Sequence, residues 1–474
     1  MPVSPSYRPD PRFFDLGDGF FDAVSPASFP LRTLRFRNQR WADRIGLGEL
    51  DAAEWEAHLA RFEPLPGNLP RPLALRYHGH QFGVYNPNLG DGRGFLFAQL
   101  RDDAGRLLDL GTKGSGKTPW SRGGDGRLTL KGGVREVLAT EMLEALGVNT
   151  SKTLSLFETG EMLFRGDEPS PTRSSVMVRL GHSHVRFGSF QRHAHLGDEK
   201  RLAELLDFAI EHYAPEVKKA EGDRVSAFLR VVAERTGALA ASYMVAGFVH
   251  GVLNTDNLNV TGESFDYGPY RFTPRYDPAF VAAYFDENGL YAYGRQPRAM
   301  LWALTRLADA LRPLSPTTAF APSLRAFEPA FDASMQRLVA RRLGVASAGA
   351  DLDAALVDAV YAFLAASQVT IDRFFFDWYG GARSAARAGA GPFAAAYTGA
   401  EFDALLHVLE AFEPAHPAIV DHPYFQGPGP CSLPIDEIET IWSRIAVDDD
   451  WSPLDAKVAA IRAMGALYSG EADG

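Results

Sequence analysis

The chain has 474 residues, enough for about three compact units at roughly 150 residues per domain. Hydrophobic residues make up 46% of it and charged residues 23%, the balance of a globular protein that can bury a sizeable core. Lysine and arginine number 48 and aspartate and glutamate 59, so the net charge is −11. Such an acidic chain argues against general nucleic-acid binding, which needs dense positive charge facing the phosphates.

Cysteine usage and hydropathy point to a cytoplasmic protein. Cys431 is the single cysteine, which excludes a disulfide framework within the chain and fits a reducing compartment. The first residues, MPVSPSYRPDPRFF, lack the basic start and apolar run of a signal peptide. No stretch approaches the ~18 consecutive apolar residues of a membrane span. We therefore expect a soluble cytoplasmic protein with neither a membrane nor a nucleic acid as partner.

The front of the chain combines a capping segment with a strand-rich unit. Residues 1–72 form an aromatic and proline-rich N-terminal segment, with one helical patch near 51–62. Extended patterns then dominate, so we expect residues 73–190 to form a strand-rich lobe. Within it, the apolar runs 95–100 and 106–110 flank an Asp-Asp-Ala-Gly turn, which predicts a β-hairpin.

A helix and one more strand follow the hairpin, and the remainder is mostly helical. Residues 134–147 carry apolar side chains at helical spacing and end on a glycine, whereas 174–180 is typical of a strand. Residues 191–312 are expected to form a helical lobe and 313–474 a helical C-terminal extension. The further helical patterns lie at 201–213, 225–249, 299–311, 353–366, 400–412 and 455–467. Strands in front and helices behind predict an α+β fold.

The string GTKGSGKT (111–118) matches the phosphate-loop pattern G-x-x-x-x-G-K-[ST]. That loop works because its amides wrap the phosphates and the helix after it directs its N-terminus at them. Here Pro119 comes at once, and the glycine pair 123–124 would stop a helix almost as soon as it began. We favour a glycine-rich loop that brings Lys113 or Lys117 near phosphate, with a true phosphate loop as the alternative.

Three pieces of sequence together suggest an ATP site of the protein-kinase kind. NLGDGRG (88–94) is a glycine-rich turn entering a strand, which can lay backbone amides over phosphates. Lys113 ends the next predicted strand, and Glu136 lies 23 residues further on, in the first turn of the predicted helix. Protein kinases use such a Lys–Glu ion pair to orient the ATP phosphates. Taken singly, each piece also fits a simpler structure, such as a connecting turn, a solvated lysine or a favourable charge at a helix start.

HGVLNTDN (250–257), followed by DYG (266–268), is the most specific pattern in the chain. Kinases have a catalytic loop H-R-D-x-x-x-x-N and then D-F-G, and His250 and Asn257 stand seven apart as that pattern requires. Asn257 and Asp266 offer the hard oxygen ligands that suit magnesium bridging phosphates.

One position breaks the kinase pattern. Val252 occupies the place of the catalytic aspartate, and a valine side chain cannot accept a hydroxyl proton. Either the protein is an inert nucleotide binder, or its chemistry is arranged differently. In the second case Asp256, beside the metal-binding Asn257, is the obvious replacement carboxylate.

These strings resemble the selenoprotein O family, whose members are kinase-fold protein adenylyltransferases. The resemblance runs from about residue 70 to about residue 312 and rests on long, unusual strings. They are YHGHQFG (77–83), NPNLGDGRG (86–94), TPWSRGGDGR (118–127), VREVLATEML (134–143), VRLGHSHVRFGSF (178–190), HGVLNTDN (250–257) and FDYGPY (265–270). The resemblance implies a protein-kinase-like two-lobed core. It also implies that ATP lies reversed relative to kinases and presents its α-phosphate to the acceptor.

The resemblance further implies roles for individual residues along the nucleotide. Lys113 would hold phosphate oxygens, and Glu136 would orient that lysine. Arg179 and Arg186 would grip the γ-phosphate, which suits the fork of a guanidinium group. The residues implied to form the nucleotide site are Gly90, Gly92, Arg93, Lys113, Asp125, Gly126, Glu136, Arg179, Arg186 and Asp266.

On the reaction side, the resemblance assigns the metal ion and the base. Asn257 and Asp266 would bind magnesium, or manganese in its place, and Asp256 would be the general base for the acceptor. The implied function is magnesium-dependent transfer of AMP from ATP to Ser, Thr or Tyr hydroxyls of other proteins, with release of pyrophosphate. The alternatives are a phosphotransferase (kinase) and a catalytically inert, ATP-binding pseudokinase scaffold.

The match has gaps. The run KGGVRE (131–136) departs from the polar, serine-containing run usual in the family, although Glu136 is kept. Many relatives carry a selenocysteine or cysteine almost at the C-terminus. Here the last residues are SGEADG and Cys431 is far upstream, which argues against redox control through a terminal cysteine. After about residue 313 the chain resembles the family only weakly, so docking of protein substrates is not inferred from that part.

Overall fold

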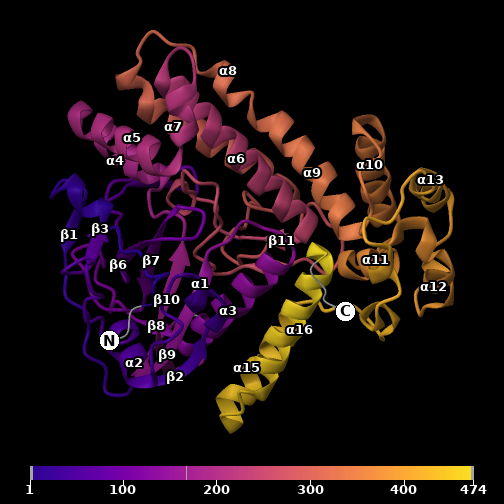
Figure 1. Ribbon diagram of the computed structural model, residues 1–474, viewed down its shortest axis with the longest axis horizontal. Coiled ribbons are helices and arrows are strands. Elements are labelled where there is room, and N and C mark those ends of the chain that lie inside the picture. Colours follow the sequence, from indigo (N-terminus) through magenta and orange to yellow (C-terminus); the bar gives the residue numbers. More distant parts are fainter. Residues whose placement is uncertain (1–3, 167, 471–474) are drawn as a thin grey trace.

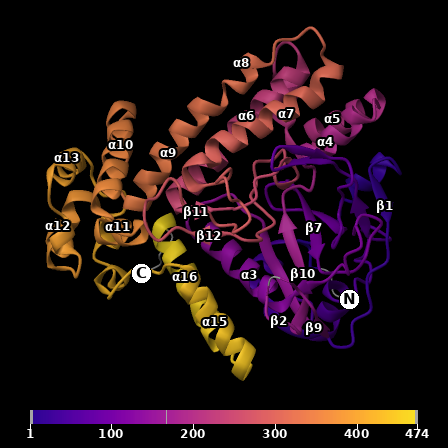
Figure 2. The same cartoon turned by 180° about the vertical axis from the view of Figure 1, so that it is seen from behind.

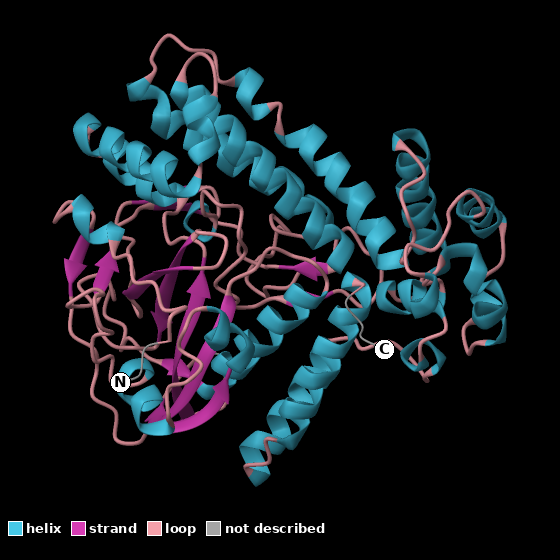
Figure 3. Cartoon of the chain, in the orientation of Figure 1, coloured by secondary structure: helices cyan, strands magenta, loops and turns pink. Residues whose placement is uncertain are grey.

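The computed structural model describes residues 4–166 and 168–470. Figure 1 shows a twisted β-sheet on one side of the molecule, long helices beside it and a cluster of shorter helices on the far side. In Figure 3 the strands gather in one region and helices fill the rest. The fold is mixed, with an antiparallel sheet at the front of the chain and helices behind it, so the α+β prediction is confirmed.

The main sheet has eight strands in the order β1-β3-β6-β7-β10-β9-β2, with β8 pairing with β10. Its edge strands β1 and β2 both come from the first 72 residues, so the N-terminal segment is part of the sheet that residues 73–190 build. Two small sheets pair β4 with β5 and β11 with β12. The strands are β1 (Phe21–Ala23), β2 (Thr33–Arg37), β3 (Leu73–Leu75), β4 (Gly79–Gln81), β5 (Val84–Asn86), β6 (Leu96–Arg101), β7 (Leu107–Lys113), β8 (Leu128–Thr129), β9 (Lys152–Leu163), β10 (Thr172–Gly181), β11 (Phe248–Val249) and β12 (Arg271–Phe272).

The predicted hairpin at residues 95–110 is confirmed. Strands β6 and β7 pair antiparallel, and Gly105 in the turn between them has φ 75, a left-handed value that glycine adopts without strain. All residues of β7 are buried, and the strand ends at Lys113. Because β7 lies between β6 and β10 in the middle of the sheet, this lysine starts from a rigid position.

The helix that carries Glu136 begins earlier than the sequence predicts. α3 spans Leu130–Ala145, so Glu136 lies in its second turn and the expected first-turn position is wrong. The hydroxyl of Thr129 caps its N-terminus. A Cβ on Gly133 would come within 2.5 Å of the Leu156 side chain on β9. The glycines before Val134 therefore serve close packing of α3 on the sheet rather than a loop.

The C-terminal helices return to α3. α15 (Ile435–Asp448) and α16 (Ser452–Ser469) both contact α3, and they are the last two helices of the chain (Figure 1, and from behind in Figure 2). Arg462 on α16 donates to both carboxylate oxygens of Glu141 on α3, at 2.8 and 2.7 Å. The helical extension is therefore joined to the helix that carries Glu136.

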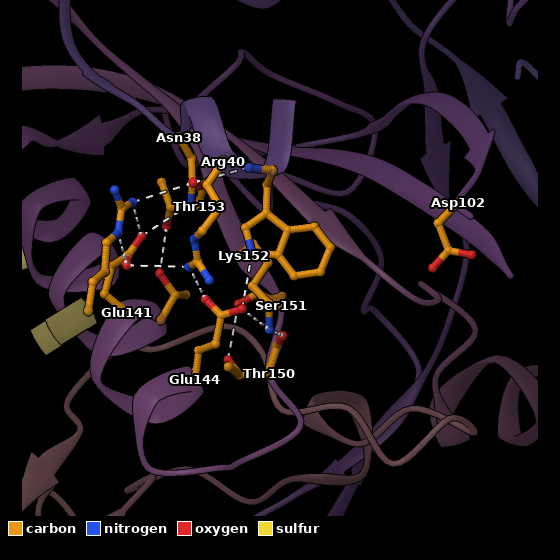
Figure 4. A network of polar contacts seen from close by, with 12 residues as sticks. Asn38, Arg40, Asp102, Glu141, Glu144, Thr150, Ser151, Lys152 and Thr153 are labelled. Atoms are coloured by element: carbon orange, nitrogen blue, oxygen red, sulfur yellow. Dashed lines mark hydrogen bonds and ion pairs between the residues drawn. The ribbon is translucent and has the colours of Figure 1, made fainter. Parts of the chain in front are cut away.

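Figure 4 shows how the same helix is held from its other side. The amide of Asn38, which precedes α1, donates to Glu141 Oε1 at 3.1 Å. Glu144, one turn further along α3, accepts from Arg40 and lies 3.7 Å from Lys152 Nζ on β9. The N-terminal segment, the sheet and the C-terminal extension thus all fix the position of α3.

The longest helix of the second half is α6, which has 23 residues. It packs along α9 and α7. The predicted helices at 201–213, 299–311, 353–366, 400–412 and 455–467 are confirmed as α5, α7, α10, α13 and α16, and the predicted 225–249 helix ends at Ala246, before β11. The other bounds are α1 (Gln39–Arg44), α2 (Ala52–Leu59), α4 (Phe187–His195), α5 (Glu199–Tyr213), α6 (Arg224–Ala246), α7 (Gln296–Leu311), α8 (Ala321–Leu324), α9 (Phe327–Leu343), α10 (Ala350–Ser367), α11 (Ile371–Asp377), α12 (Ala385–Ala390), α13 (Ala400–Leu409) and α14 (Pro417–Val420).

Two expectations from composition bear on the described residues. Within 4–166 and 168–470, no helix is both long and apolar enough to cross a membrane. Cys431 is a free thiol that is neither fully buried nor fully exposed, and burial raises its pKa. Most of the terminal SGEADG string, residues 471–474, lies outside the described residues.

Candidate active site

A cleft of about 600 Å³ opens between the sheet and the loops that follow α6. Every site residue named from the sequence lines this cleft except Glu136, which is buried behind Lys113. The predicted site residues among its lining are Gly90, Gly92, Arg93, Lys113, Asp125, Gly126, Arg179, Arg186, Asp256, Asn257 and Asp266. The fold therefore gathers residues that are far apart in the sequence into one hollow.

The cleft is locally basic although the chain as a whole is acidic. Seven basic side chains and four acidic side chains line it. An anion such as a polyphosphate is attracted by this excess of positive charge. The basic residues are Arg93, Lys113, Arg122, Arg127, Arg165, Arg179 and Arg186, and the acidic ones are Asp91, Asp125, Asp256 and Asp266.

Four charged side chains interlock at the inner end of the cleft. Lys113 Nζ lies 2.5 Å from Glu136 Oε2 and 2.7 Å from Asp266 Oδ1. Arg179 Nη1 lies 3.4 Å from Glu136 Oε1 and from Asp266 Oδ1. The Lys113, Glu136 and Arg179 side chains are almost completely buried. Two cations and two anions balance each other here, as buried charges must.

Asp266 is the member of this cluster that reaches the solvent side. Its side chain is 28% exposed, and its backbone has φ 64, a left-handed value that is unusual for a residue other than glycine. Burial alone would raise the pKa of Asp266, but Lys113 and Arg179 outweigh that and hold the pKa well below its usual range. The carboxylate therefore stays ionised, and its Oδ2 accepts no hydrogen bond from the described residues.

Arg186 forms the wall opposite this cluster. Its guanidinium group lies between the rings of Tyr77, at 4.5 Å, and Phe265, at 4.8 Å. Nη1 donates to the backbone carbonyl of Asp256 at 2.7 Å, and Nη2 lies 3.4 Å from Asp91 Oδ1. The aromatic rings and the carbonyl therefore fix the orientation of this guanidinium group at the cleft.

The HGVLNTDN loop follows α6 and β11, and a short 3₁₀ turn, Thr255–Asn257, places its end at the cleft. His250 is fully buried, and its Nε2 lies 3.0 Å from the carbonyl of Phe265, which ties this loop to the DYG turn. The amide Nδ2 of Asn257 donates to the carbonyl of Val252 at 2.9 Å. That bond turns the Asn257 Oδ1 atom away from the loop, and this oxygen accepts no hydrogen bond from the described residues.

Asp256 has the environment of a proton acceptor. Its side chain is buried, lines the cleft, and its Oδ1 has no hydrogen-bond partner among the described residues. Burial raises the pKa of Asp256 to about 6, although the positive charge of Arg186 acts in the opposite direction. A Cβ on Gly79 would come within 2.9 Å of Asp256 Oδ1, so the β4 backbone closes over the carboxylate. A carboxylate that lines a cleft and has a raised pKa is suited to take a proton from a bound hydroxyl.

The residues also fit a divalent cation. Within the described part of the chain, no group of three or more His, Cys, Asp or Glu side chains is placed to hold a metal ion. Asn257 Oδ1 and Asp266 Oδ2 are nevertheless two hard oxygen atoms without protein donors, and both residues line the cleft. Magnesium is commonly held by one or two protein oxygens together with substrate phosphates and water. This donor set therefore suits magnesium bound along with a nucleotide.

The glycine-rich loops pack on each other at the rim. Gly90 has the Trp120 ring against its backbone, since a Cβ there would lie 2.4 Å from the ring, and Ser121 donates to the carbonyl of Gly92. Residues 114–127 form turns, and α3 begins only at Leu130. No helix follows GTKGSGKT directly in the described residues, which excludes the phosphate-loop alternative. Lys117 is exposed and does not line the cleft.

Some cleft residues were not singled out individually from the sequence. Tyr77 stacks on Arg186, Asp91 pairs with it, and Trp120 covers the glycine turn. Arg165 pairs with Asp125 at 2.8 Å across the outer rim. Tyr77, Asp91 and Trp120 lie inside the strings YHGHQFG, NLGDGRG and TPWSRGGDGR, so those strings were the available signal. For Arg165 the sequence gives no comparable signal.

A family model described as "Protein adenylyltransferase SelO" matches residues 5–462. The chain belongs to this family. A similar protein from Synechocystis sp. is 46% identical over 466 residues, which cover 96% of this chain and 97% of the relative. A protein from Gloeobacter violaceus is 44% identical over 471 residues (96% and 94%), and one from Vibrio cholerae is 38% identical over 365 residues (77% and 73%). All three relatives are named protein nucleotidyltransferase YdiU.

Membership in the SelO family confirms the resemblance and lengthens it. The match continues to residue 462, so it extends well beyond the 70–312 range on which the resemblance rested. The reason is that helical segments of ordinary composition carry few unusual strings, although they align along their whole length. As a member of SelO, the chain is assigned to an enzyme family, the protein nucleotidyltransferases.

Proposed function

We propose that this SelO member transfers AMP from ATP to Ser, Thr or Tyr hydroxyls of other proteins in a magnesium-dependent reaction. The observation that carries the proposal is the meeting of two features in one cleft. Glu136 and Asp266 hold the cationic Lys113 in a fixed position for phosphates, and Asp256 offers a carboxylate in the same cleft. The printed names of the family and the relatives support the transferred group and the protein acceptor.

In the proposed complex, the phosphates of ATP lie across the basic lining of the cleft. Lys113 holds phosphate oxygens while Glu136 fixes the lysine, and Arg179 and Arg186 take the γ-phosphate. The glycine turn with Gly90, Gly92 and Arg93 lies along the nucleotide, and Asp125 and Gly126 complete its pocket at the rim. Asn257 and Asp266 hold magnesium, or manganese, which neutralises phosphate charge when it is bound.

The transfer step uses the free oxygen of Asp256. The acceptor hydroxyl oxygen attacks the α-phosphorus, and a new oxygen–phosphorus bond forms as the bond from that phosphorus to the bridging oxygen of the β-phosphate breaks. Pyrophosphate leaves with the electron pair of that bond. Asp256 takes the hydroxyl proton, which explains how the loop can work with Val252 in place of a kinase-type aspartate.

We propose further that the fold is a two-lobed kinase-like core. Residues 73–190, with the strands that 1–72 adds, form the first lobe, and residues 191–312 form the second. The support is the order of parts: a glycine turn, a strand lysine, a helix glutamate, a catalytic loop and an Asp-Tyr-Gly turn surround one cleft. Residues 313–474 form a helical extension whose end supports α3.

One experiment separates the proposal from its alternatives. The purified protein is incubated with magnesium, intact proteins as acceptors, and ATP labelled either at the α- or at the γ-phosphate. We expect α-label on protein and no γ-label. γ-Label on the product would indicate a kinase, and the absence of both labels from every product would indicate an inert ATP-binding scaffold. Replacing magnesium by a chelator is expected to stop the transfer.

A further inference from the structure

A second groove, of about 650 Å³, lies next to the nucleotide cleft. Phe82 at the tip of the β4–β5 hairpin lines it together with Leu290, Tyr291 and Trp302. We call these four residues the aromatic groove. None of them lines the nucleotide cleft, so the proposed transfer reaction does not account for them.

The aromatic groove exposes apolar surface that the fold does not cover. Phe82 is 37% exposed, Leu290 40% and Trp302 37%. Tyr284 and Phe285 extend this surface, since Phe285 lies 5.8 Å from the ring of Phe82 and both residues are exposed. Contiguous apolar surface on a water-facing part of a protein marks a place where another molecule binds.

The hairpin holds Phe82 at the surface against its backbone preference. Phe82 has φ 50 and Gly83 has φ 79, so both residues of the turn are left-handed. For an aromatic residue this conformation is uncommon and costs energy. Its ring packs 5.0 Å from the ring of Tyr291 but stays partly exposed, so burial does not explain the conformation. Backbone strain of this kind is typical of functional sites.

Asn254 joins the aromatic groove to the proposed reaction centre. Its Oδ1 accepts from the backbone N–H of Phe82 at 3.1 Å and from the hydroxyl of Tyr291 at 2.8 Å. Asn254 itself lines the nucleotide cleft, two residues before Asp256. The aromatic groove and the cleft that contains Asp256 therefore meet at Asn254.

The groove is positively charged at its rim. Arg295 and Arg298 both line it and both are exposed. Arg295 donates to backbone carbonyls of residues 288 and 289, and Arg298 forms no ion pair with any residue in the described part of the chain. Buried Asp286 accepts from the N–H groups of Leu290 and Tyr291, which fixes the loop that carries the apolar side chains. Two available guanidinium groups beside apolar surface complement a segment with both an apolar and an acidic residue.

We propose that the aromatic groove binds an extended segment of the protein substrate next to its acceptor hydroxyl. A large apolar side chain of that segment packs between Phe82 and Trp302, and an Asp or Glu side chain pairs with Arg298. The inference rests on the proposed function, because it names the part of the protein acceptor that the site recognises. It assigns sequence preference to residues outside the nucleotide cleft.

The test uses a positional-scanning library of synthetic peptides, each with one Ser, Thr or Tyr acceptor, and ATP labelled at the α-phosphate. We expect one position that favours large apolar residues and another that favours Asp or Glu. In Arg298→Glu the acidic preference should disappear or turn into a Lys or Arg preference, with kcat/KM for the best acidic peptide roughly tenfold lower. The affinity for ATP, measured separately by binding, should not change, because Arg298 does not line the nucleotide cleft.

The matched control is Arg325→Glu, which makes the same charge change at an exposed arginine outside both grooves. This variant should keep the wild-type peptide preference. Identical preferences in Arg298→Glu and in the wild type would overturn the inference, as would labelling of intact proteins without labelling of any peptide. Failure to label any acceptor, protein or peptide, would instead refute the proposed function. Leu290→Ser provides a second variant, which should weaken the apolar preference while the acidic preference remains.

Discussion

The two walls of the nucleotide cleft are built in opposite ways. On the sheet side, Lys113, Glu136 and Arg179 are almost completely buried and each is paired with an opposite charge. On the loop side, Asp256 and Asn257 each keep an oxygen without a hydrogen-bond partner among the described residues. Paired charges hold their geometry and can bind a polyanion without reorganising. Unpaired oxygens are free for a proton or a cation, so the two walls divide binding from reaction.

The largest expected effect, on the rate of AMP transfer, comes from a substitution in the loop wall of the cleft. Asp256→Asn keeps the shape of the side chain and one accepting oxygen but removes its ability to take a proton. We expect AMP transfer to fall by about 10²–10⁴-fold, the usual contribution of a general base, while ATP with magnesium still binds. Single-turnover transfer of α-label and a separate nucleotide-binding measurement check both parts. Transfer at close to the parent rate would show that Asp256 only caps the loop.

The next largest effect, on the affinity for ATP, comes from a substitution in the sheet wall of the cleft. Lys113→Ala removes the cation that contacts both Glu136 and Asp266, and leaves these carboxylates facing each other across Arg179. Loss of a charge-assisted contact to phosphate is worth about 1.5–3 kcal/mol in ATP binding. Isothermal titration with ATP measures it, and thermal unfolding shows whether the variant is folded. Lys117→Ala, four residues away and exposed, is the control and should bind ATP like the parent.

A smaller effect separates the terminal phosphate from the rest of the nucleotide. Arg186→Lys keeps the positive charge but loses the planar fork that Tyr77 and Phe265 hold. We expect the affinity for ATP to fall roughly tenfold and that for AMP to change little, since AMP lacks the γ-phosphate. Parallel titrations with the two nucleotides measure the ratio. An equal loss for both would show that Arg186 serves the fold, through its bond to the Asp256 carbonyl.

The smallest effect is on the pH dependence of stability. It comes from Glu263, which lies in the chain between Asn257 and Asp266. This side chain is buried and accepts from the N–H of His182, with the charged side chains of Lys152, Arg106 and Asp109 around it. Burial raises the pKa of Glu263 from 4.5 to about 7, although Lys152 acts in the opposite direction.

Because the folded state then binds a proton that the unfolded state releases, the Glu263 contribution to stability falls as pH rises from about 4.5 to about 7. In Glu263→Gln the free energy of unfolding should change less with pH over this range. The stability of the variant relative to the wild type should therefore rise toward pH 8, as measured by denaturant unfolding at several pH values. A difference between variant and wild type that stays constant across this range would contradict the assignment of the shift to Glu263.

The parts of the site that were predictable from the sequence are those encoded by neighbouring residues. Asn257 follows Asp256 directly, and a loop of fixed spacing after a long helix is recognisable wherever it occurs. The hairpin around Gly105 was predictable for the same reason, since turn chemistry is local. To single out Lys113 and Glu136, it was enough to predict a strand that ends near the lysine and a helix that begins near the glutamate. The predicted start of α3 is four residues late, but this error did not change the choice of either residue.

What the sequence did not reveal depends on contacts between distant segments. Nothing near Gly90 indicates that Trp120 lies on it, and nothing in residues 33–37 indicates that they pair with β9. The strand β9 itself was missed because seven of its twelve residues are buried, on both faces of the sheet, which removes the two-residue alternation that marks a half-exposed strand. The helix α9 carries Pro329 near its start and mixes charged with apolar residues, and no residue range was predicted for it.

The ion pair between Arg462 and Glu141 has a consequence for biosynthesis. The two residues are 321 positions apart, so α3 leaves the ribosome long before its partner α16 is made. At the usual rates of about 5–20 residues per second, that interval lasts tens of seconds. During that time Glu136 and the cleft it supports lack one of the contacts that position them. The nascent chain therefore gains this contact to α3 only after nearly all of the polypeptide has been translated.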